Sequence, residues 1–408
     1  MIVRLIVCIW LSIATSVPAL GAAQCDSTSR GLIPLTELGG TYKGEPGGLY
    51  PDGANTPPPA HDSAGRAIAQ SFVALDTLGN IDSLNGAWVL LSIGMSNCNL
   101  EFANFAAGIV GDSAIHPRLR LVNGAQGGWA AEDMKYDTSG YWVFPESRLR
   151  WVGLHPIQVQ AVWLKNVHQG PSGTFPGEAM GLRDDLRDVA RLLKVKFPNL
   201  RQIFVTSRIY AGYASSGGNP EPYAYESGFA NRWLIEAQIN GNDSLNFDDT
   251  QGPADAPWIA WGPYVYADGI NPRSDDSLQW LCEDFNQTDG THPGTSGIAK
   301  VGTMLDEFFR TSPYTSEWFL ATTTPSCACD CHPDPVCDDV RSDVLDVVNT
   351  INVAFRGIAP APDPNAACPY ETTDVDCTSA TDVLDVVHVV NVAFRGVAAA
   401  TEFCDPCP

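Results

Sequence analysis

The sequence predicts an α/β domain built on a parallel sheet with helices on both faces, followed by a small helical domain. Five short apolar runs have the length and composition of buried strands: 88–93, 118–123, 158–165, 202–207 and 257–261. Four segments that alternate with these runs show helical periodicity: 97–109, 178–196, 226–239 and 295–310. Strands that alternate with helices along a chain form a parallel sheet covered on both faces.

Residues 1–23 have the layout of a secretory signal peptide. Arg4 precedes an apolar stretch at 5–20, and small residues follow it. Gln24 ahead of Cys25 disfavours a lipid anchor, since a lipoprotein signal needs a small residue there. No other apolar segment approaches the roughly 20 residues of a membrane span. We therefore expect a protein secreted to the extracellular space, the cell surface or the periplasm.

Acidic residues dominate the charge of the chain and limit its partners. Among 408 residues, 47 Asp and Glu outnumber 24 Lys and Arg, for a formal net charge of −23 at pH 7. This balance disfavours nucleic acids and anionic membranes, because their phosphates require clustered cations. Residues 325–408 hold fourteen acids against three Arg, a surplus that indicates cation binding.

Composition divides the chain into four parts. The signal segment, 1–23, precedes a large domain at 24–322. The start of that domain, 24–87, is rich in Gly and Pro and is expected to consist mostly of loops. A linker at 323–333 leads into a small domain at 334–408.

The cysteines predict disulfides and an oxidising destination. Eight of the twelve lie beyond residue 325. The large domain keeps Cys25, Cys98 and Cys282, an odd number, so at least one is free or pairs with the small domain. Cys98 and Cys282 each lie near one of the two segments described next, and a bridge between them is one of the pairings that the sequence leaves open.

Two short segments carry the residue types of a serine hydrolase. Residues 94–97, Gly-Met-Ser-Asn, follow an apolar run, so Ser96 is expected at the carboxyl end of a buried strand, where open α/β sheets bind ligands. Residues 289–292, Asp-Gly-Thr-His, set an acid and an imidazole three residues apart. Each residue alone also fits a helix N-cap, but their joint placement favours catalysis. The predicted triad is Ser96, His292 and Asp289.

These segments resemble the first and last sequence blocks of the SGNH (GDSL-like) hydrolases, and the likeness extends over about residues 88–310. Met95 stands where the family has an acidic residue. In that family, a Gly after the second strand and an Asn after the third complete the oxyanion hole. The resemblance places these roles, beside the Ser96 amide, on Gly124, with Ala125 as its alternative, and on Asn166.

The resemblance implies a three-layer α/β fold of flavodoxin-like strand order and a secreted serine esterase that needs no cofactor for catalysis. Its substrate would be an ester, with acyl groups on polysaccharides as one class. The alternative is a non-catalytic glycan-binding or surface adhesion protein on the same scaffold. Residues 111–113, Gly-Asp-Ser, match the family's name motif more closely, but they follow a helical pattern and precede a strand, so we interpret them as a loop.

The small domain contains a repeat with a spacing of 39 residues, because the pattern at 343–357 recurs at 382–396. Each copy predicts a loop and an amphipathic helix ended by Gly, and the two copies can bury their apolar faces only against each other. Ahead of the second helix, oxygen-bearing groups occupy positions 1, 3, 5, 7, 9 and 12 of a calcium loop. They are Asp374, Asp376, Thr378, the carbonyl of Ala380, Asp382 and Asp385.

The paired units resemble a dockerin type I domain, which is a pair of EF-hand-like units. The resemblance implies Ca²⁺ in the second loop and a cohesin-like partner. Ser379 replaces the usual turn Gly, and apolar pairs at 344–345 and 383–384 occupy the partner-selecting positions. A solvated acidic face is the alternative interpretation. The first loop is a weaker candidate, with these acids: Asp334, Asp338, Asp339, Asp343 and Asp346.

Overall fold

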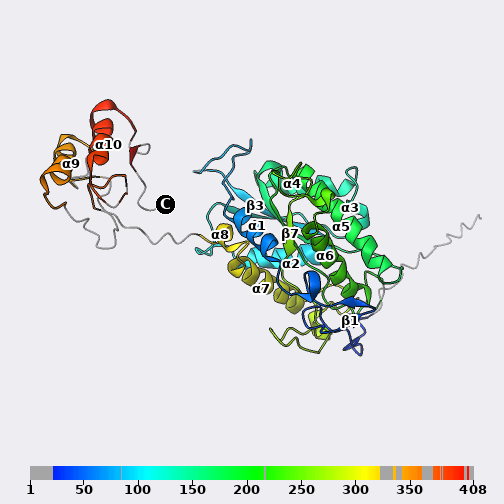
Figure 1. The fold of residues 1–408 in the computed structure, drawn as a ribbon. Coiled ribbons are helices and arrows are strands. Elements are labelled where there is room, and N and C mark those ends of the chain that lie inside the picture. Colours follow the sequence, from blue (N-terminus) through cyan, green and yellow to red (C-terminus); the bar gives the residue numbers. More distant parts are fainter. Residues whose placement is uncertain are drawn as a thin grey trace, which may run out of the picture. The chain divides into compact units, whose positions relative to one another are not determined.

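The computed structural model describes residues 22–83, 85–215, 217–321, 334–336, 342–360, 371–376, 378, 380–398 and 402–403. Most of the predicted signal peptide, the linker at 323–333, and Asp338 and Asp339 of the first loop lie outside the described residues. The chain forms two compact units, Met1–Ala321 and Thr322–Pro408. Figure 1 labels their elements.

The larger unit contains a five-stranded sheet. Its strands are β3 (Trp88–Gly94), β4 (Leu119–Asn123), β5 (Val159–Lys165), β6 (Gln202–Val205) and β7 (Trp258–Trp261). They run in the order β4-β3-β5-β6-β7, and every neighbouring pair is parallel. All residues of β3 and β5 are buried, as expected of strands covered on both faces. The prediction of a mixed α/β fold with a parallel sheet is confirmed.

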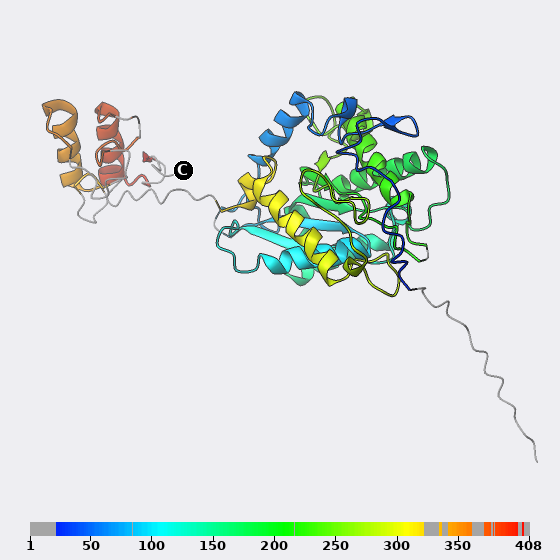
Figure 2. The ribbon, with the colours of Figure 1, turned by 90° about the horizontal axis from the view of Figure 1, so that it is seen from below.

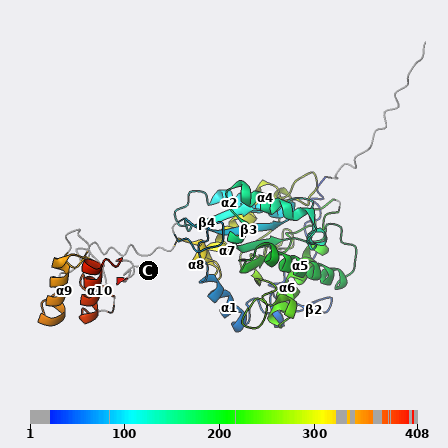
Figure 3. The ribbon, with the colours of Figure 1, turned by 90° about the horizontal axis from the view of Figure 1, so that it is seen from above.

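Two pairs of long helices cover the sheet. Helix α2 (Ser96–Gly108) packs against α7 (Thr295–Thr311), and α5 (Gly177–Lys196) packs against α6 (Tyr223–Ile239). Figure 3 shows α2 on one side of β3 and β4, and α5 and α6 on the other. Figure 2 shows α7, in yellow, lying across the strands. The sheet core is therefore closed to water, while the loops at the strand ends remain accessible.

The first part of the larger unit contains more regular structure than the sequence predicts. Helix α1 (Pro59–Ala69) packs its Gly65 against Trp258 of β7, so closely that an added Cβ would lie 2.2 Å from the Trp258 ring. The run of three prolines at 57–59 and Gly65 inside the helix conceal it from periodicity arguments. The remaining elements of this unit are β1 (Thr41–Tyr42), β2 (Glu45–Pro46), η1 (Pro51–Gly53), α3 (Ala131–Met134), η2 (Gly140–Trp142), α4 (Val143–Trp151), η3 (Pro156–Gln158), η4 (Asp243–Leu245), η5 (Cys282–Asp284) and α8 (Ser316–Phe319).

The disulfide of the larger unit joins Cys25 to Cys282, and Cys98 is a buried free thiol. The structure thus does not form the Cys98–Cys282 bridge that the sequence left open. Cys98 lies inside α2 with its thiol 3.5 Å from the Ile93 carbonyl oxygen, so it faces the sheet. The N-terminal segment brings Cys25 to Cys282 because the Ala23 N–H donates to the Gln287 carbonyl.

The smaller unit contains two helices of the repeat, α9 (Val344–Arg356) and α10 (Val383–Arg395). Asp343 and Asp382 cap their N-termini, and a left-handed Gly ends each helix. Their contact buries a small apolar core of Val347, Val375, Val389 and Phe403. No helix in the described part of either unit combines the length and apolarity that crossing a bilayer requires.

Candidate active site

Ser96 is the first residue of α2, and Met95 alone separates it from the end of strand β3. The turn between them requires Gly94, whose φ is +155° and where an added Cβ would lie 2.1 Å from the Lys165 carbonyl oxygen. This close approach brings the serine to the carboxyl edge of the sheet, beside the end of β5. The hydroxyl therefore lies at a helix N-terminus, where the backbone dipole stabilises negative charge.

The structure brings the three residues of the predicted triad into one hydrogen-bonded line. Ser96 Oγ lies 2.8 Å from His292 Nε2, and His292 Nδ1 lies 2.9 Å from Asp289 Oδ2. Asp289 is buried, whereas the His292 side chain is 39 % exposed. Each group thus has the partner that a nucleophile, a general base and an orienting acid need.

The loop that carries Asp289 and His292 is held by its own backbone. Asp289 Oδ1 accepts the N–H groups of Thr291 at 2.8 Å and His292 at 3.0 Å. Between them, Gly290 has a φ of +63°, and a Cβ there would lie 2.0 Å from the Tyr213 carbonyl oxygen. Burial raises the pKa of Asp289, but these N–H donors and the His292 ring outweigh it and lower the pKa below its ordinary value. The carboxylate is therefore ionised at neutral pH.

A cavity of about 370 Å³ opens beside Ser96. Among the described residues of its wall, Met95 is the only large apolar side chain, and four glycines bring backbone to the surface. The cavity thus suits a small, polar ligand better than a long alkyl chain. Its lining residues are Met95, Ser96, Asn97, Gly127, Gly128, Gln169, Arg208, Gly217, Gly218, Asp289, Thr291 and His292.

Gly124 and Asn166, the two residues that the resemblance placed in the oxyanion hole, do not line this cavity. The Gly124 N–H donates to the Ser92 carbonyl at 3.1 Å, which continues the pairing of β4 with β3. The Asn166 amide is buried and donates to the Trp129 carbonyl at 3.2 Å. Both donors are thus used inside the fold, and these two predictions need correction.

The turn after β4 approaches Ser96 three residues later than predicted. The alternative donor, the Ala125 N–H, points to Asn123 Oδ1 at 3.2 Å, and the Gln126 N–H donates to the Gly94 carbonyl at 2.9 Å. At Gly127, an added Cβ would lie 3.4 Å from the Ser96 Cβ, so this residue lies against the nucleophile. The glycine-rich turn was recognised in the sequence, but its register was not.

A buried ion pair lies beneath the site and gave no signal in the sequence. Lys165 Nζ is 2.7 and 2.6 Å from the two carboxylate oxygens of Glu101, which is fully buried on α2. Burial raises the pKa of Glu101 and lowers that of Lys165, while each charge opposes the effect on the other. The pair therefore links the nucleophile helix to the end of β5.

Arg208 is a second buried cation that sequence reasoning missed, although it follows the carboxyl end of β6. Its Nη2 donates to the carbonyls of Gly218 at 3.3 Å and Thr291 at 3.4 Å. Asn97 Nδ2 donates to the same Thr291 carbonyl at 3.5 Å. The side chain thus ties one rim of the cavity to the loop that carries His292.

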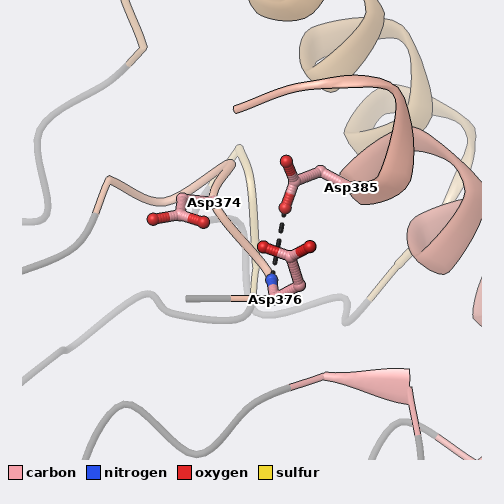
Figure 4. Close-up of side chains that lie close together, drawn as sticks. All are labelled: Asp374, Asp376 and Asp385. Carbon is pink, nitrogen blue, oxygen red and sulfur yellow. Dashed lines mark hydrogen bonds between the residues drawn. The ribbon is translucent and has the colours of Figure 1, made fainter. Parts of the chain in front are cut away.

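In the smaller unit, three predicted calcium ligands come together: Asp374, Asp376 and Asp385 have carboxylate oxygens within 4.8 Å of one another. Figure 4 shows them side by side, with the Asp376 N–H donating to Asp385 Oδ1 at 3.2 Å. The Thr378 N–H donates to Asp374 and Asp376, and its hydroxyl donates to the Ala380 carbonyl at 3.4 Å. This cluster offers the oxygen ligands that a hard cation prefers.

Asp382 has a different role from the three clustered acids, because its Oδ1 accepts the Leu384 N–H and caps α10. In the first loop, Asp346 is buried and accepts the N–H groups of Val336 at 3.0 Å and Asp343 at 2.7 Å. Burial and the charge of Asp334 raise the pKa of Asp346. Asp334, Asp343 and Asp346 are therefore neighbours, but Asp338 and Asp339 lie outside the described residues.

Comparison with known proteins gives a limited result. The chain matches no protein-family model and no curated protein. A protein from Arabidopsis thaliana, solved by X-ray crystallography, is 15 % identical over 52 % of this chain and 67 % of its own, with a TM-score of 0.29. The periplasmic domain of a lipopolysaccharide acetyltransferase from Salmonella ser. Paratyphi A is 13 % identical over 61 % of this chain and 95 % of its own, with a TM-score of 0.32. At these TM-scores neither likeness identifies a function.

Proposed function

We propose that the chain is a secreted serine esterase of the SGNH type. The observation that carries the proposal is the hydrogen-bonded line from Ser96 through His292 to Asp289 at the carboxyl edge of a parallel sheet. The strand order β4-β3-β5-β6-β7 is the one expected of a flavodoxin-like sheet, and it supports the same assignment. The Cys25–Cys282 disulfide fits an oxidising compartment.

In the proposed mechanism, Ser96 Oγ attacks the ester carbonyl while His292 Nε2 takes the hydroxyl proton. The Asp289 carboxylate holds the Nδ1 proton of the ring and stabilises the imidazolium that forms. The imidazolium then returns a proton to the leaving alcohol, and water hydrolyses the acyl-enzyme by the same steps in reverse order.

Negative charge on the carbonyl oxygen would be stabilised by backbone N–H groups. Ser96 at the N-terminus of α2 supplies one, and Gly127, which lies against Ser96, supplies a second in place of Gly124. The amide of Gln169, which lines the cavity, would take the role that the resemblance gave to Asn166. Turn geometry sets the positions of the two backbone donors, so they can be kept although the sequence of the block differs from that of the family.

The substrate class follows from the wall of the cavity. One partly buried Met and a surface of glycines and polar side chains leave room for a short acyl group on a polar alcohol. We therefore propose acetyl or similar groups on a carbohydrate as the substrate. The second candidate, a non-catalytic glycan-binding protein, would use the same cavity, and measured turnover distinguishes it from the first.

Hydrolysis of 4-nitrophenyl acetate and labelling by a fluorophosphonate probe test the proposed activity together. We expect turnover by the full chain and covalent labelling of Ser96, identified by peptide mass spectrometry. Ser113, in the Gly-Asp-Ser segment, is the matched control and should carry no label, because it lies in a loop between α2 and β4. A folded chain with neither turnover nor label would favour the glycan-binding alternative.

We further propose that the smaller unit is a dockerin-like domain that binds Ca²⁺ through Asp374, Asp376 and Asp385, and that it attaches the enzyme to a cohesin-like partner. Gathering three carboxylates within 4.8 Å costs electrostatic free energy that a divalent cation would offset. The repeated loop-helix pattern of α9 and α10 supports the same assignment.

Calcium should therefore stabilise the smaller unit alone. At a free concentration a hundred times its dissociation constant, one bound ion adds about 2.7 kcal/mol to the free energy of unfolding. All eleven Trp precede the smaller unit in the sequence, so their fluorescence reports the larger unit and should not change with calcium. Calorimetry of the full chain would show that calcium moves the unfolding transition of the smaller unit to a higher temperature, and Asp376→Ala should remove this shift. A calcium-independent thermogram would contradict the proposal.

A further inference from the structure

His168 occupies an enclosed position between β5 and α5, near the catalytic cavity but outside it. Its Nδ1 lies 2.8 Å from Glu178 Oε1, and its Nε2 lies 3.1 Å from Asp185 Oδ2, so both ring nitrogens face carboxylate oxygens from α5. Only a ring that carries protons on both nitrogens can donate to both carboxylates. The surroundings therefore select the imidazolium form.

Charged groups from the other packed elements complete this environment. Lys135, just beyond α3, lies 2.8 Å from Asp185 Oδ1, and Glu132 of α3 adds a further negative charge near the ring. Glu226 of α6 also faces the small space beside His168, but it is paired with Lys43 at 2.9 Å. Carboxylates thus outnumber cations around the ring.

The pKa of His168 reflects this balance. Burial lowers it, but the hydrogen bonds to Asp185 and Glu178 and the charge of Glu132 outweigh burial and raise the pKa from 6.5 to about 8. The contacts of the cationic ring are therefore present in full below pH 6.5 and are lost as the pH rises through about 8.

The backbone of His168 connects this cluster to two rims of the catalytic cavity. The next residue, Gln169, lines the cavity, and its N–H donates to Glu132 Oε1 at 3.0 Å. On the other side, Asn219 Nδ2 donates to the His168 carbonyl at 3.3 Å, directly after the cavity-lining pair 217–218. One ring thus anchors both segments to α5.

We infer that His168, held between Glu178 and Asp185, is a positioning residue that fixes the Gln169 rim and the 217–218 rim of the catalytic cavity for substrate binding. The inference rests on the proposed esterase function. It assigns to His168 a role in substrate affinity, because the ring touches neither Ser96 nor His292, whose own hydrogen bonds do not involve the rims. Loss of the His168 contacts should therefore raise KM and leave kcat nearly unchanged.

The test is the pH dependence of kcat and KM for 4-nitrophenyl acetate in the full chain. Between about pH 7 and 9, KM of the wild type should rise about tenfold, because the proton linkage of a pKa raised from 6.5 to about 8 weakens by about that factor over this interval. His168→Gln should show the high KM at every pH with kcat within about twofold of the wild type. His168→Arg keeps a permanent cation between the two carboxylates and should keep the low KM above pH 8.

Two comparisons identify the titrating group. His116→Gln, before β4 at the other end of the sheet strands, should retain the wild-type profile. Burial raises the pKa of Glu221 to about 7. If Glu221 were the titrating group, the rise in KM would be centred near pH 7 and would persist in both His168 variants. Ser96-dependent turnover with an unchanged KM profile in His168→Gln would overturn this inference alone. A wild type without turnover would overturn the esterase function, and the inference with it.

Discussion

Replacing Ser96 with Ala is expected to lower kcat for 4-nitrophenyl acetate by about 10⁶-fold, because the nucleophile and its base act as one unit. His292→Ala should cost as much, and the double variant no more than either alone. Asp289→Asn should cost about 10⁴-fold, because an amide at this position holds the wrong tautomer of His292. Single-turnover kinetics with purified variants would measure these losses.

The controls for the triad variants are set by the structure. Ser96 is half-buried with its side chain at the cavity, so its loss should leave the circular dichroism spectrum and thermal unfolding of the larger unit unchanged. Ser113→Ala changes the serine of the Gly-Asp-Ser segment at 111–113, and it should retain full activity. Undiminished turnover by Ser96→Ala would remove the nucleophile assignment and, with it, the proposed mechanism.

The strands and the triad segments could be predicted because their signals are local. A run such as 88–93 is apolar at every position, which is the pattern of a strand buried on both faces, and Ser96 and His292 follow from strand-end placement. Gly124 and Asn166 could not be predicted well, because a shift of a few residues in a turn decides whether an N–H faces the cavity or another strand. That choice depends on long-range contacts.

Contacts between residues that are far apart in the sequence also explain why sequence analysis did not identify some buried pairs. Glu101 and Lys165 are 64 positions apart, and neither stands in a motif, yet both are buried in contact. Cys25 pairs with Cys282 because the N-terminal segment crosses to the loop that follows β7, a path with no periodic signal. Arg208, in contrast, could have been suspected from its position just past the end of β6.

The second large effect is expected at the buried ion pair. Lys165→Met removes the only cation within hydrogen-bonding distance of Glu101 among the described residues and leaves its carboxylate in a dry environment. Breaking such a pair typically destabilises a protein by about 3–5 kcal/mol. Urea unfolding followed by Trp fluorescence measures this, since Trp163 lies on β5 two residues before Lys165 and the smaller unit contains no Trp.

The double variant, Glu101→Leu with Lys165→Met, separates charge from packing. Apolar side chains of similar volume avoid both desolvation costs, so most of the stability lost in the single variant should return. Glu101 also faces the buried Arg208, whose remaining carboxylate neighbours are Glu221 and Asp289. If the double variant is stable but its kcat falls, the pair contributes to the placement of the nucleophile helix. If the double variant is as unstable as the single one, the site depends on shape at this contact, and the electrostatic explanation is wrong.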